Sequence, residues 1–398
     1  MYNKLPTGYI TKSTVFIISS GALGYVGIEL ATGSENFYEK AVMPLVHRYV
    51  EGEESHKWAV KACSWGLLPC FGHNQKEYPE LECEVLGKHF KNPVGLAAGF
   101  DKDGEAIVPL AKTSGFGLVE IGSITPIPQQ GNPRPRVFRL LEDQGVINRY
   151  GFNSDGVGKV QQRVKTARSQ WTDDLAVFGI NLGKNKLTED AKLDYEIGVT
   201  YFGPYCDYLV INISSPNTPG LRSMQKKTDL EKLAKYVKSS VDLLDVQQKP
   251  KILLKIAPDL VQSEMSDIAK VVLDKKHGID GLIISNTTIS RPESLKSENK
   301  EQTGGLSGQP VKHISTKCVR EMYKMTGGKV PIIGCGGIAS GQDAYEKIRA
   351  GASLVQLYSA LVYKGFPIVG KVKRELVECL KRDGYSHVGE AVGADHRK

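Results

Sequence analysis

The stretch YCDYLVINISSPNT, residues 205–218, joins an apolar run to a polar end that contains two asparagines, two adjacent serines and a proline. The apolar part predicts a buried strand. The following segment TDLEKLAKYVKSSVDLL, residues 228–244, repeats apolar side chains at helical spacing and predicts an amphipathic helix. Together they form one β/α unit whose strand ends in polar residues.

The same unit recurs along the chain after residue 90. Eight short apolar runs each close on small or polar residues: NPVGLAAG (92–99), GLVEIGSIT (117–125), AVFGINLG (176–183), YLVINISS (208–215), ILLKIAPD (252–259), GLIISNTT (281–288), PIIGCGGI (331–338) and LVQLYSAL (354–361). Helical patterns separate most of them, for example at 261–275 and 340–351. Near-continuous apolar strands that alternate with helices predict a parallel sheet covered on both faces.

This number of units favours an α/β fold of the closed (β/α)8 type, the TIM barrel. An open doubly wound sheet is the alternative, but AAGFDKDG after the first strand lacks the GxGxxG turn of such folds. In TIM barrels the site lies at the carboxyl ends of the strands, where the polar residues gather here. Two loops are longer than usual connections. We interpret 126–175 as a covering of the site and 289–304 as a disordered insertion.

The N-terminus has a different character. Residues 13–28, STVFIISSGALGYVGI, carry no charge, and as a helix they would rise about 24 Å against the ~30 Å hydrocarbon core of a bilayer. Two lysines precede this run and three glutamates follow it: Lys4, Lys12, Glu29, Glu35 and Glu39. We expect one membrane anchor within 1–32, with the N-terminus on the positive-inside face. A cleaved signal peptide and a buried core helix are the alternatives.

Between the anchor and the barrel lie two amphipathic helical patterns, ENFYEKAVMPLVHRYV (35–50) and EESHKWAVKACSWGLLP (53–69). Each is too short to be stable alone. As a hairpin they could pack on the main domain or dip into a membrane surface, and a simple packing arm is the plainer interpretation. The predicted organisation is therefore an anchor (1–32), a hairpin (33–75) and a barrel (76–398).

Composition excludes several classes of protein. The chain has 398 residues, of which 40% are hydrophobic and 24% charged, and a net charge of +8 from scattered lysines and arginines. Without an arginine-rich helix or an RNA-binding aromatic signature, we expect no nucleic-acid binding. The seven cysteines form no CxxC pair, which argues against a disulfide framework and against a zinc site.

The last two strands of the barrel end in the glycine turn GCGGI (334–338) and in LYSA (357–360), and TGGLSG (303–308) adds a third flexible segment. Backbone N–H groups of such turns cradle anions, and the loops after strands seven and eight are the common phosphate site of this fold. Tight packing is the alternative. The position favours a phosphate-bearing ligand.

Two lysines and five asparagines lie in or after the strands: Lys102, Lys255, Asn148, Asn181, Asn212, Asn217 and Asn286. A lysine inside a buried strand needs a negative partner, so Lys255 should meet an anion or act as a Schiff-base nucleophile. Asparagine offers a donor and an acceptor without charge, which suits a pyrimidine or an isoalloxazine ring. Flavin mononucleotide (FMN) accounts for both the phosphate and the ring.

Several of these motifs together resemble one family. AAGFDK, NRYGFN, NLGKNK, NISSPNTPGLR, KIAPD, NTT, TGGLSG, the run from GCGGI to LYSAL, and the terminal GADHR are similar to the class 2 dihydroorotate dehydrogenases over nearly the whole chain. The resemblance implies oxidation of dihydroorotate to orotate in pyrimidine synthesis, with FMN as hydride acceptor and ubiquinone as reoxidant. It implies a monomeric protein of the mitochondrial inner membrane whose catalytic domain faces the intermembrane space.

The resemblance also assigns residues. The FMN set is Ala97, Ala98, Gly99, Ser123, Asn148, Asn181, Asn212, Lys255, Thr287, Gly308, Gly337, Tyr358 and Ser359. The orotate set is Lys102, Asn148, Asn212, Asn217, Asn286 and Thr287. The quinone set is Met43, Val46, His56, Ala59, Leu67, Leu68, Arg139 and Tyr358, whereas His47 departs from the amide common in relatives.

In the family pattern Ser215 is the general base that takes a proton from C5 while hydride leaves C6. Phe152 shields it, and Thr218 helps to relay the proton through water. Class 1 relatives carry cysteine at this position, so serine agrees with class 2. A lyase with Lys255 as Schiff-base former, and a tethered binding protein without turnover, are the competing interpretations.

Overall fold

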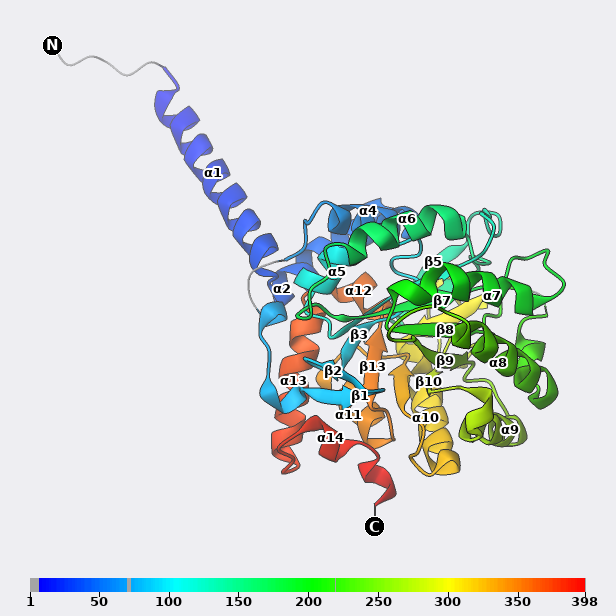
Figure 1. The fold of residues 1–398 in the computed structure, drawn as a ribbon. Coiled ribbons are helices and arrows are strands. Elements are labelled where there is room, and N and C mark those ends of the chain that lie inside the picture. Colours follow the sequence, from blue (N-terminus) through cyan, green and yellow to red (C-terminus); the bar gives the residue numbers. More distant parts are fainter. Residues whose placement is uncertain (1–6, 70–72, 219, 398) are drawn as a thin grey trace.

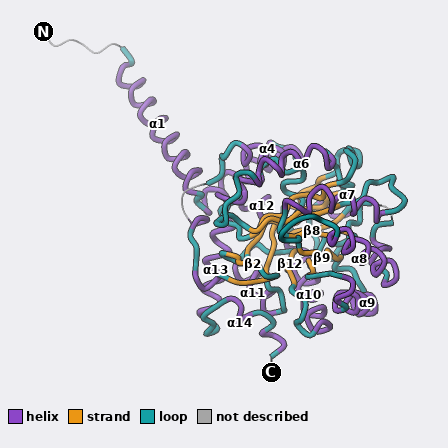
Figure 2. Tube along the Cα trace, viewed as in Figure 1, coloured by secondary structure: helices purple, strands orange, loops and turns teal. Residues whose placement is uncertain are grey.

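Eight parallel strands close into a barrel, and helices surround it (Figures 1 and 2). The computed structural model describes residues 7–69, 73–218 and 220–397. The barrel strands follow chain order around the ring: β3 (Val94–Leu96), β4 (Leu118–Ile124), β7 (Val177–Leu182), β8 (Tyr208–Asn212), β9 (Lys251–Ile256), β10 (Gly281–Ile284), β12 (Ile332–Cys335) and β13 (Leu354–Leu357). The predicted TIM barrel is confirmed, and each of the eight predicted runs supplies one strand.

Helices follow the strands and cover the outside of the barrel (Figure 1). They are α5 (Ile107–Thr113), α6 (Gly156–Arg168), α7 (Ala191–Phe202), α8 (Lys227–Asp242), α9 (Gln262–Leu273), α10 (Lys312–Thr326), α11 (Gly341–Arg349), α12 (Ser359–Lys364), α13 (Ile368–Arg382) and α14 (Val388–Ala391). In α8 the side chains of Leu230, Leu233, Val237 and Val241 are buried. Their spacing places them on one face, which packs on the sheet.

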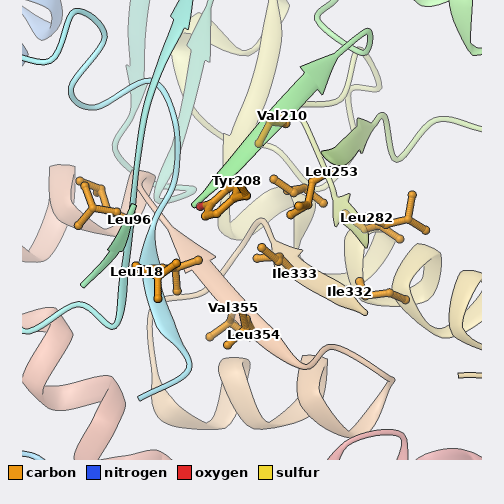
Figure 3. Close-up of a cluster of buried hydrophobic side chains, with 14 of the residues drawn as sticks. Leu96, Leu118, Tyr208, Val210, Leu253, Leu282, Ile332, Ile333, Leu354 and Val355 are labelled. Atoms are coloured by element: carbon orange, nitrogen blue, oxygen red, sulfur yellow. The ribbon is translucent and has the colours of Figure 1, made fainter. Parts of the chain in front are cut away.

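The interior of the barrel is filled by side chains (Figure 3). Tyr208 of β8 shows how tightly, because a Cβ added at Gly179 on the neighbouring strand β7 would lie 2.0 Å from the Tyr208 ring. Only glycine fits there. The Tyr208 hydroxyl donates to the buried carboxylate of Glu120 at 3.3 Å, and Gln356 donates to the same carboxylate at 2.7 Å. The interior is therefore a packed core rather than a channel.

Two small antiparallel sheets lie outside the ring. β1 (Cys83–Val85) and β2 (Lys88–Phe90) form a hairpin, and the second sheet contains β5 (Val137–Leu140), β6 (Gly145–Asn148) and β11 (Gly305–Gly308). A bridge between Thr288 and Leu306 joins the second sheet to the segment after β10. The three-stranded sheet therefore stands at the carboxyl end of the barrel, where the predicted site lies.

Both long loops are built into the structure. The predicted loop 126–175 contains β5, β6 and α6. The prediction of disorder for 289–304 is wrong: the Asp143 carboxylate accepts from the backbone N–H of Lys296 at 2.9 Å and of Ser297 at 3.0 Å, and Leu295 is buried. These contacts come from residues about 150 positions away in the chain, which local composition does not reveal.

The N-terminal helix α1 (Tyr9–Thr32) projects away from the barrel (Figure 1). It has no buried residue, and its length and apolar composition are sufficient to cross a membrane. Its 24 residues rise about 36 Å, more than the predicted 16-residue run would. The helix of the predicted anchor thus extends beyond the uncharged run 13–28 at both ends. Lys4, which the prediction also used, lies outside the described residues.

The predicted hairpin comprises α2 (Glu35–Phe37), a π-helical turn (Tyr38–Val42), α3 (Met43–Tyr49) and α4 (Gly52–Ser64). The π turn ends at Val42, two residues before Pro44, which lacks a backbone N–H to continue the α-helical pattern. The hairpin docks on the barrel through an ion pair of 2.8 Å between Glu35 and Arg374 of α13. Residues 70–72, including Cys70 of the predicted hairpin segment, lie outside the described residues.

Candidate active site

One cavity of about 500 Å³ extends from the carboxyl ends of the barrel strands to the hairpin. Residues from all three predicted sets line it. From the barrel these are Ala97, Ala98, Gly99, Lys102, Ser123, Asn148, Phe152, Asn212, Ser215, Asn217, Lys255, Asn286, Thr287, Gly308, Gly337, Tyr358 and Ser359. From the hairpin and the sheet beside it these are Met43, Val46, His56, Ala59, Leu67, Leu68 and Arg139. Asn181 and Thr218 are the predicted residues that do not line it.

The predicted asparagines lie in two hydrogen-bonded groups, together called the amide network, at the barrel end of the cavity. Asn286 donates to the Asn212 side-chain oxygen at 3.1 Å, and its carbonyl side accepts from the backbone N–H of Thr287 at 2.8 Å. Asn217 donates to the Asn148 backbone oxygen at 3.2 Å. These bonds fix the orientation of each amide before any ligand arrives, which lowers the entropic cost of binding.

Asn181 has a supporting position behind this network. It is fully buried, donates to Glu120 at 2.9 Å, and accepts from Asn212 at 3.0 Å and from the Ser123 hydroxyl. Its hydrogen-bonding groups are therefore engaged by protein. Asn181 connects the buried carboxylate in the barrel interior to the cavity wall.

One buried and one half-buried lysine bring positive charge to the cavity. Lys255 of β9 is 5% exposed, and no carboxylate of the described residues lies within 4.0 Å of its ammonium group. The described residues therefore do not supply the negative partner that a buried lysine needs, and Lys255 lines the cavity. Burial lowers the pKa of Lys102 to about 8, and the nearby Asp103 carboxylate opposes that shift.

The glycine turn after β12 packs directly on the start of α10. Gly337 has a left-handed φ of 73°, and a Cβ there would lie 2.5 Å from the Lys312 Cα. Nearby, the Ser359 hydroxyl donates to Ser307 at 2.8 Å, and the Ser285 hydroxyl is buried without a hydrogen-bond partner among the described residues. Lys255 has no described counterion, the Ser285 hydroxyl has no described partner, and the glycine turn at Gly337 offers backbone N–H groups. These three features fit a flavin that carries a phosphate.

Ser215 lies on the loop after β8 and is 7% exposed. Its Oγ accepts from the Asn217 backbone N–H at 3.3 Å, and no imidazole or carboxylate of the described residues hydrogen-bonds to it. Phe152 lines the same part of the cavity with a left-handed φ of 54°. The neighbouring Thr218 hydroxyl is buried without a protein partner among the described residues.

One residue of this loop was missed by sequence reasoning, although it ends the motif NISSPNTPGLR. The Arg222 guanidinium donates to the Ser214 backbone oxygen at 3.1 Å, to Asp259 at 2.9 Å and to the Thr287 backbone oxygen at 3.1 Å. It therefore ties the loop of Ser215 to the loops that follow β9 and β10.

At the hairpin end, His56 is held by two hydrogen bonds. Its Nε2 lies 2.6 Å from the Phe100 backbone oxygen and its Nδ1 lies 3.2 Å from the Tyr150 hydroxyl. Because a carbonyl only accepts, Nε2 carries the proton and Nδ1 accepts from the phenol. Burial lowers the pKa of His56 to about 4, so the imidazole is neutral at physiological pH.

Arg139 and His47 line the same end of the cavity. Arg139 donates to the backbone oxygens of His47 at 3.2 Å and Val50 at 2.6 Å, while its Nε is buried without a partner among the described residues. His47 Nε2 lies 2.7 Å from the Val362 backbone oxygen, and burial lowers the pKa of this imidazole. This end thus offers a cation without a carboxylate partner in the described chain.

Comparisons with known proteins agree with this geometry. The family model described as dihydroorotate dehydrogenase matches residues 80–380. The chain is 53% identical over 385 residues to the mitochondrial dihydroorotate dehydrogenase (quinone) of Mus musculus, covering 96% of each chain. It is 50% identical over 349 residues to the dihydroorotate dehydrogenase (quinone) of Rhodospirillum rubrum, covering 87% of this chain and 92% of that one.

Solved structures give the same result. The crystal structure of DHODH in complex with ferulenol from Eimeria tenella superposes with a TM-score of 0.84 at 45% sequence identity. The match covers 88% of this chain and 97% of that chain. The likeness therefore extends over most of the chain.

Proposed function

Because this chain belongs to the dihydroorotate dehydrogenase family and is a quinone-dependent member of it, we propose that FMN is its resident cofactor and Ser215 its general base. The chain oxidises dihydroorotate, with a quinone as electron acceptor. The observation that carries the proposal is the single cavity, which joins the amide network of the barrel to the apolar hairpin.

Bound FMN would supply the hydride acceptor and pass the electrons on to the quinone. The predicted FMN set would hold it, with the glycines at 308 and 337 and Ser359 beside its phosphate and Lys255 supplying positive charge to the ring. The absence of a carboxylate near Lys255 among the described residues supports this assignment. A buried cation without a protein counterion is costly, and an electron-rich ligand beside it would offset that cost.

The orotate set would hold the pyrimidine ring. Asn148, Asn212, Asn217 and Asn286 offer donors and acceptors to its alternating N–H and C=O groups, and Lys102 would pair with its carboxylate. Thr287 completes the set. The preformed bonds between the amides support the proposal because oriented groups contribute to rate as well as to affinity.

Ser215 would take the proton from C5 as hydride leaves C6. A serine hydroxyl is a weak base at its ordinary pKa, so its own proton must leave as it acts. The Thr218 hydroxyl, which has no hydrogen-bond partner among the described residues, would begin such a relay through water, and Phe152 would keep bulk solvent away from the serine.

The quinone would enter at the hairpin. Apart from Arg139, the members of the quinone set are apolar or aromatic and line the cavity, and Arg139 supplies a cation for a quinone oxygen. Trp58, Trp65 and Leu67 of the hairpin are more than 60% exposed, which suits contact with a membrane surface where quinones dissolve. The hairpin (33–75) would thus act as the quinone tunnel and the barrel (76–398) as the FMN domain.

The relatives named mitochondrial, together with α1, indicate association with a mitochondrial membrane. We place α1 in the inner membrane with the barrel in the intermembrane space, as a monomer that contacts lipid and no nucleic acid. Lys12 before the apolar run and Glu29, Glu35 and Glu39 after it support this orientation. Protease protection tests it, since added protease should digest the barrel in mitoplasts, whose outer membrane is opened, but not in intact mitochondria.

The central test is anaerobic reduction of the purified protein by dihydroorotate, followed by flavin absorbance. Ser215→Ala should retain FMN but slow its reduction by about 10²–10⁴-fold, the usual contribution of a general base. Ser240→Ala is the matched control, because Ser240 is a 9% exposed serine of α8 whose hydroxyl donates to the Tyr236 backbone oxygen at 3.0 Å and which does not line the cavity. Equal rates in the two variants would place the base elsewhere, and a protein that takes up no flavin would end the proposal.

A further inference from the structure

Tyr150 is buried between the two ends of the cavity and belongs to none of the predicted sets. It follows β6, is 9% exposed, and lines the cavity. Its hydroxyl and its ring meet different partners. The hydroxyl is 3.2 Å from His56 Nδ1 on the hairpin, and the ring centroid is 4.2 Å from the Lys102 ammonium nitrogen.

The contact with Lys102 is the shorter of two cation contacts on this ring. Arg136 lies 5.1 Å from the same centroid, but its charge is balanced by Glu53 of α4, which accepts two hydrogen bonds at 2.8 and 2.9 Å. Lys102 makes no ion pair with a described carboxylate. An ammonium over an aromatic face is attracted by the ring, so Tyr150 helps the nearby Asp103 carboxylate to hold this lysine.

The contact with His56 determines what that residue can offer. Both ring nitrogens are engaged by protein, Nε2 by the Phe100 backbone oxygen and Nδ1 by the phenol. His56 therefore has no free N–H for a quinone oxygen. It contributes the face of a neutral ring whose orientation depends on Tyr150.

These contacts also connect the elements. Glu53 and His56 are three residues apart and share one face of α4. Both reach the carboxyl end of the barrel, Glu53 through Arg136 and His56 through Phe100, which lies two residues before Lys102. Tyr150 contacts both His56 and Lys102, so a shift of α4 would be transmitted to Lys102 through the hydroxyl and the ring of Tyr150.

We propose that Tyr150 is a positioning residue for both substrates: its ring holds Lys102 for the carboxylate of the pyrimidine, and its hydroxyl holds His56 for the quinone. This rests on the proposed function of the cavity. The two roles belong to different atoms, so two substitutions separate them. Tyr150→Phe keeps the ring and removes the hydroxyl, whereas Tyr150→Leu removes both.

Three measurements on the FMN-loaded full-length enzyme test the proposal. Orotate affinity follows from the absorbance change of the bound flavin, and flavin reduction by dihydroorotate and reoxidation by a short-chain ubiquinone are followed separately in a stopped-flow instrument. Tyr78→Leu is the matched control, since Tyr78 is also 9% exposed with Lys76 5.0 Å from its ring, but does not line the cavity.

Tyr150→Phe should slow reoxidation by about threefold to tenfold, the size of one hydrogen bond, with orotate affinity within about twofold of the wild-type value. Tyr150→Leu should show the same slow reoxidation and in addition weaken orotate by about tenfold, the size of the cation–π contact. Tyr150→Phe thereby retains orotate binding but not the rate of reoxidation by quinone. Tyr78→Leu should change neither.

The proposal is overturned if Tyr150→Leu binds orotate as the wild type does, or if Tyr150→Phe is reoxidised at the wild-type rate. The second result decides the matter even where the leucine variant does not fold, because phenylalanine keeps the packed ring. Failure of dihydroorotate to reduce the wild-type flavin is a different outcome. It refutes the proposed function itself and this inference with it.

Discussion

Arg222 is the residue whose substitution most sharply tests how the site is assembled. Its guanidinium spans the backbone oxygens of Ser214 and Thr287 and the carboxylate of Asp259. One of these acceptors precedes the proposed base, and another belongs to a proposed substrate contact. Arg222→Met removes all three bonds while keeping most of the side-chain volume.

The magnitude follows from these bonds. A hydrogen bond to a charged group is worth roughly 1.5–3 kcal/mol when buried, but the Arg222 and Asp259 side chains are 23% and 16% exposed, so solvent reduces the total. We expect a loss of about 1–3 kcal/mol. If the loss acts on the position of Ser215 in the transition state, flavin reduction slows by about 5- to 160-fold at 1.36 kcal/mol per factor of ten.

A matched control lies at the other end of the same strand. Lys88 pairs with Asp207 just before β8 at 2.8 Å, with side chains 24% and 13% exposed, whereas Arg222 acts just after β8. Lys88→Met should lower the melting temperature by an amount similar to that of Arg222→Met but leave flavin reduction unchanged. Reoxidation by quinone should be normal in both variants. Equal reduction rates in the two variants, or an Arg222→Met rate within about twofold of wild type, would refute the positioning role.

Three further perturbations address charge, cofactor binding and anchoring. The kcat/KM for dihydroorotate should fall as pH rises through about 8, because burial lowers the pKa of Lys102 to about 8 and only the protonated amine attracts the carboxylate. The fall should vanish in Lys102→Arg, and a fall that persists in this variant would exclude Lys102 as its origin. Gly337→Ala should weaken FMN binding by at least about tenfold, measured as flavin retained on purification, because the added Cβ would lie 2.5 Å from the Lys312 backbone. Gly327→Ala, at a φ of 59° with open space around it, should retain the flavin, and equal retention in the two variants would contradict a phosphate cradle at Gly337. Deleting residues 1–33 should abolish co-sedimentation with liposomes while dihydroorotate still reduces a soluble dye, and undiminished co-sedimentation would assign membrane binding to the hairpin.

The periodic parts of the fold could be predicted from the sequence because they depend on local pattern. Each of the eight apolar runs became a barrel strand, and the helix predicted at 228–244 is α8 within a few residues. The small sheet of β5, β6 and β11 was not predicted. Its strands pair residues that lie up to about 160 positions apart, and their composition resembles that of loops.

The candidate site divides in the same way. Motif residues such as Ser215 and Lys102 could be placed, because polar residues after parallel strands must meet at one end of a barrel. Their supporting partners could not, since Asn181 is engaged by a buried glutamate and Lys255 lacks any described counterion, which only the assembled structure reveals. Tyr150 and Arg222 both lie inside quoted motifs, so their presence in NRYGFN and NISSPNTPGLR was a signal that the sequence reasoning did not use.

The closure of the ring has a consequence for a protein held on a membrane. Tethering confines copies to a plane, where neighbours meet far more often than in solution. An open sheet under such crowding exposes unpaired backbone groups that can recruit strands from another copy and start aggregation. Here each of the eight barrel strands pairs with a neighbour on both sides. Among the described residues, free strand edges therefore remain only in the two short antiparallel sheets. The barrel can therefore accumulate at high surface density without presenting an extended template for misassembly.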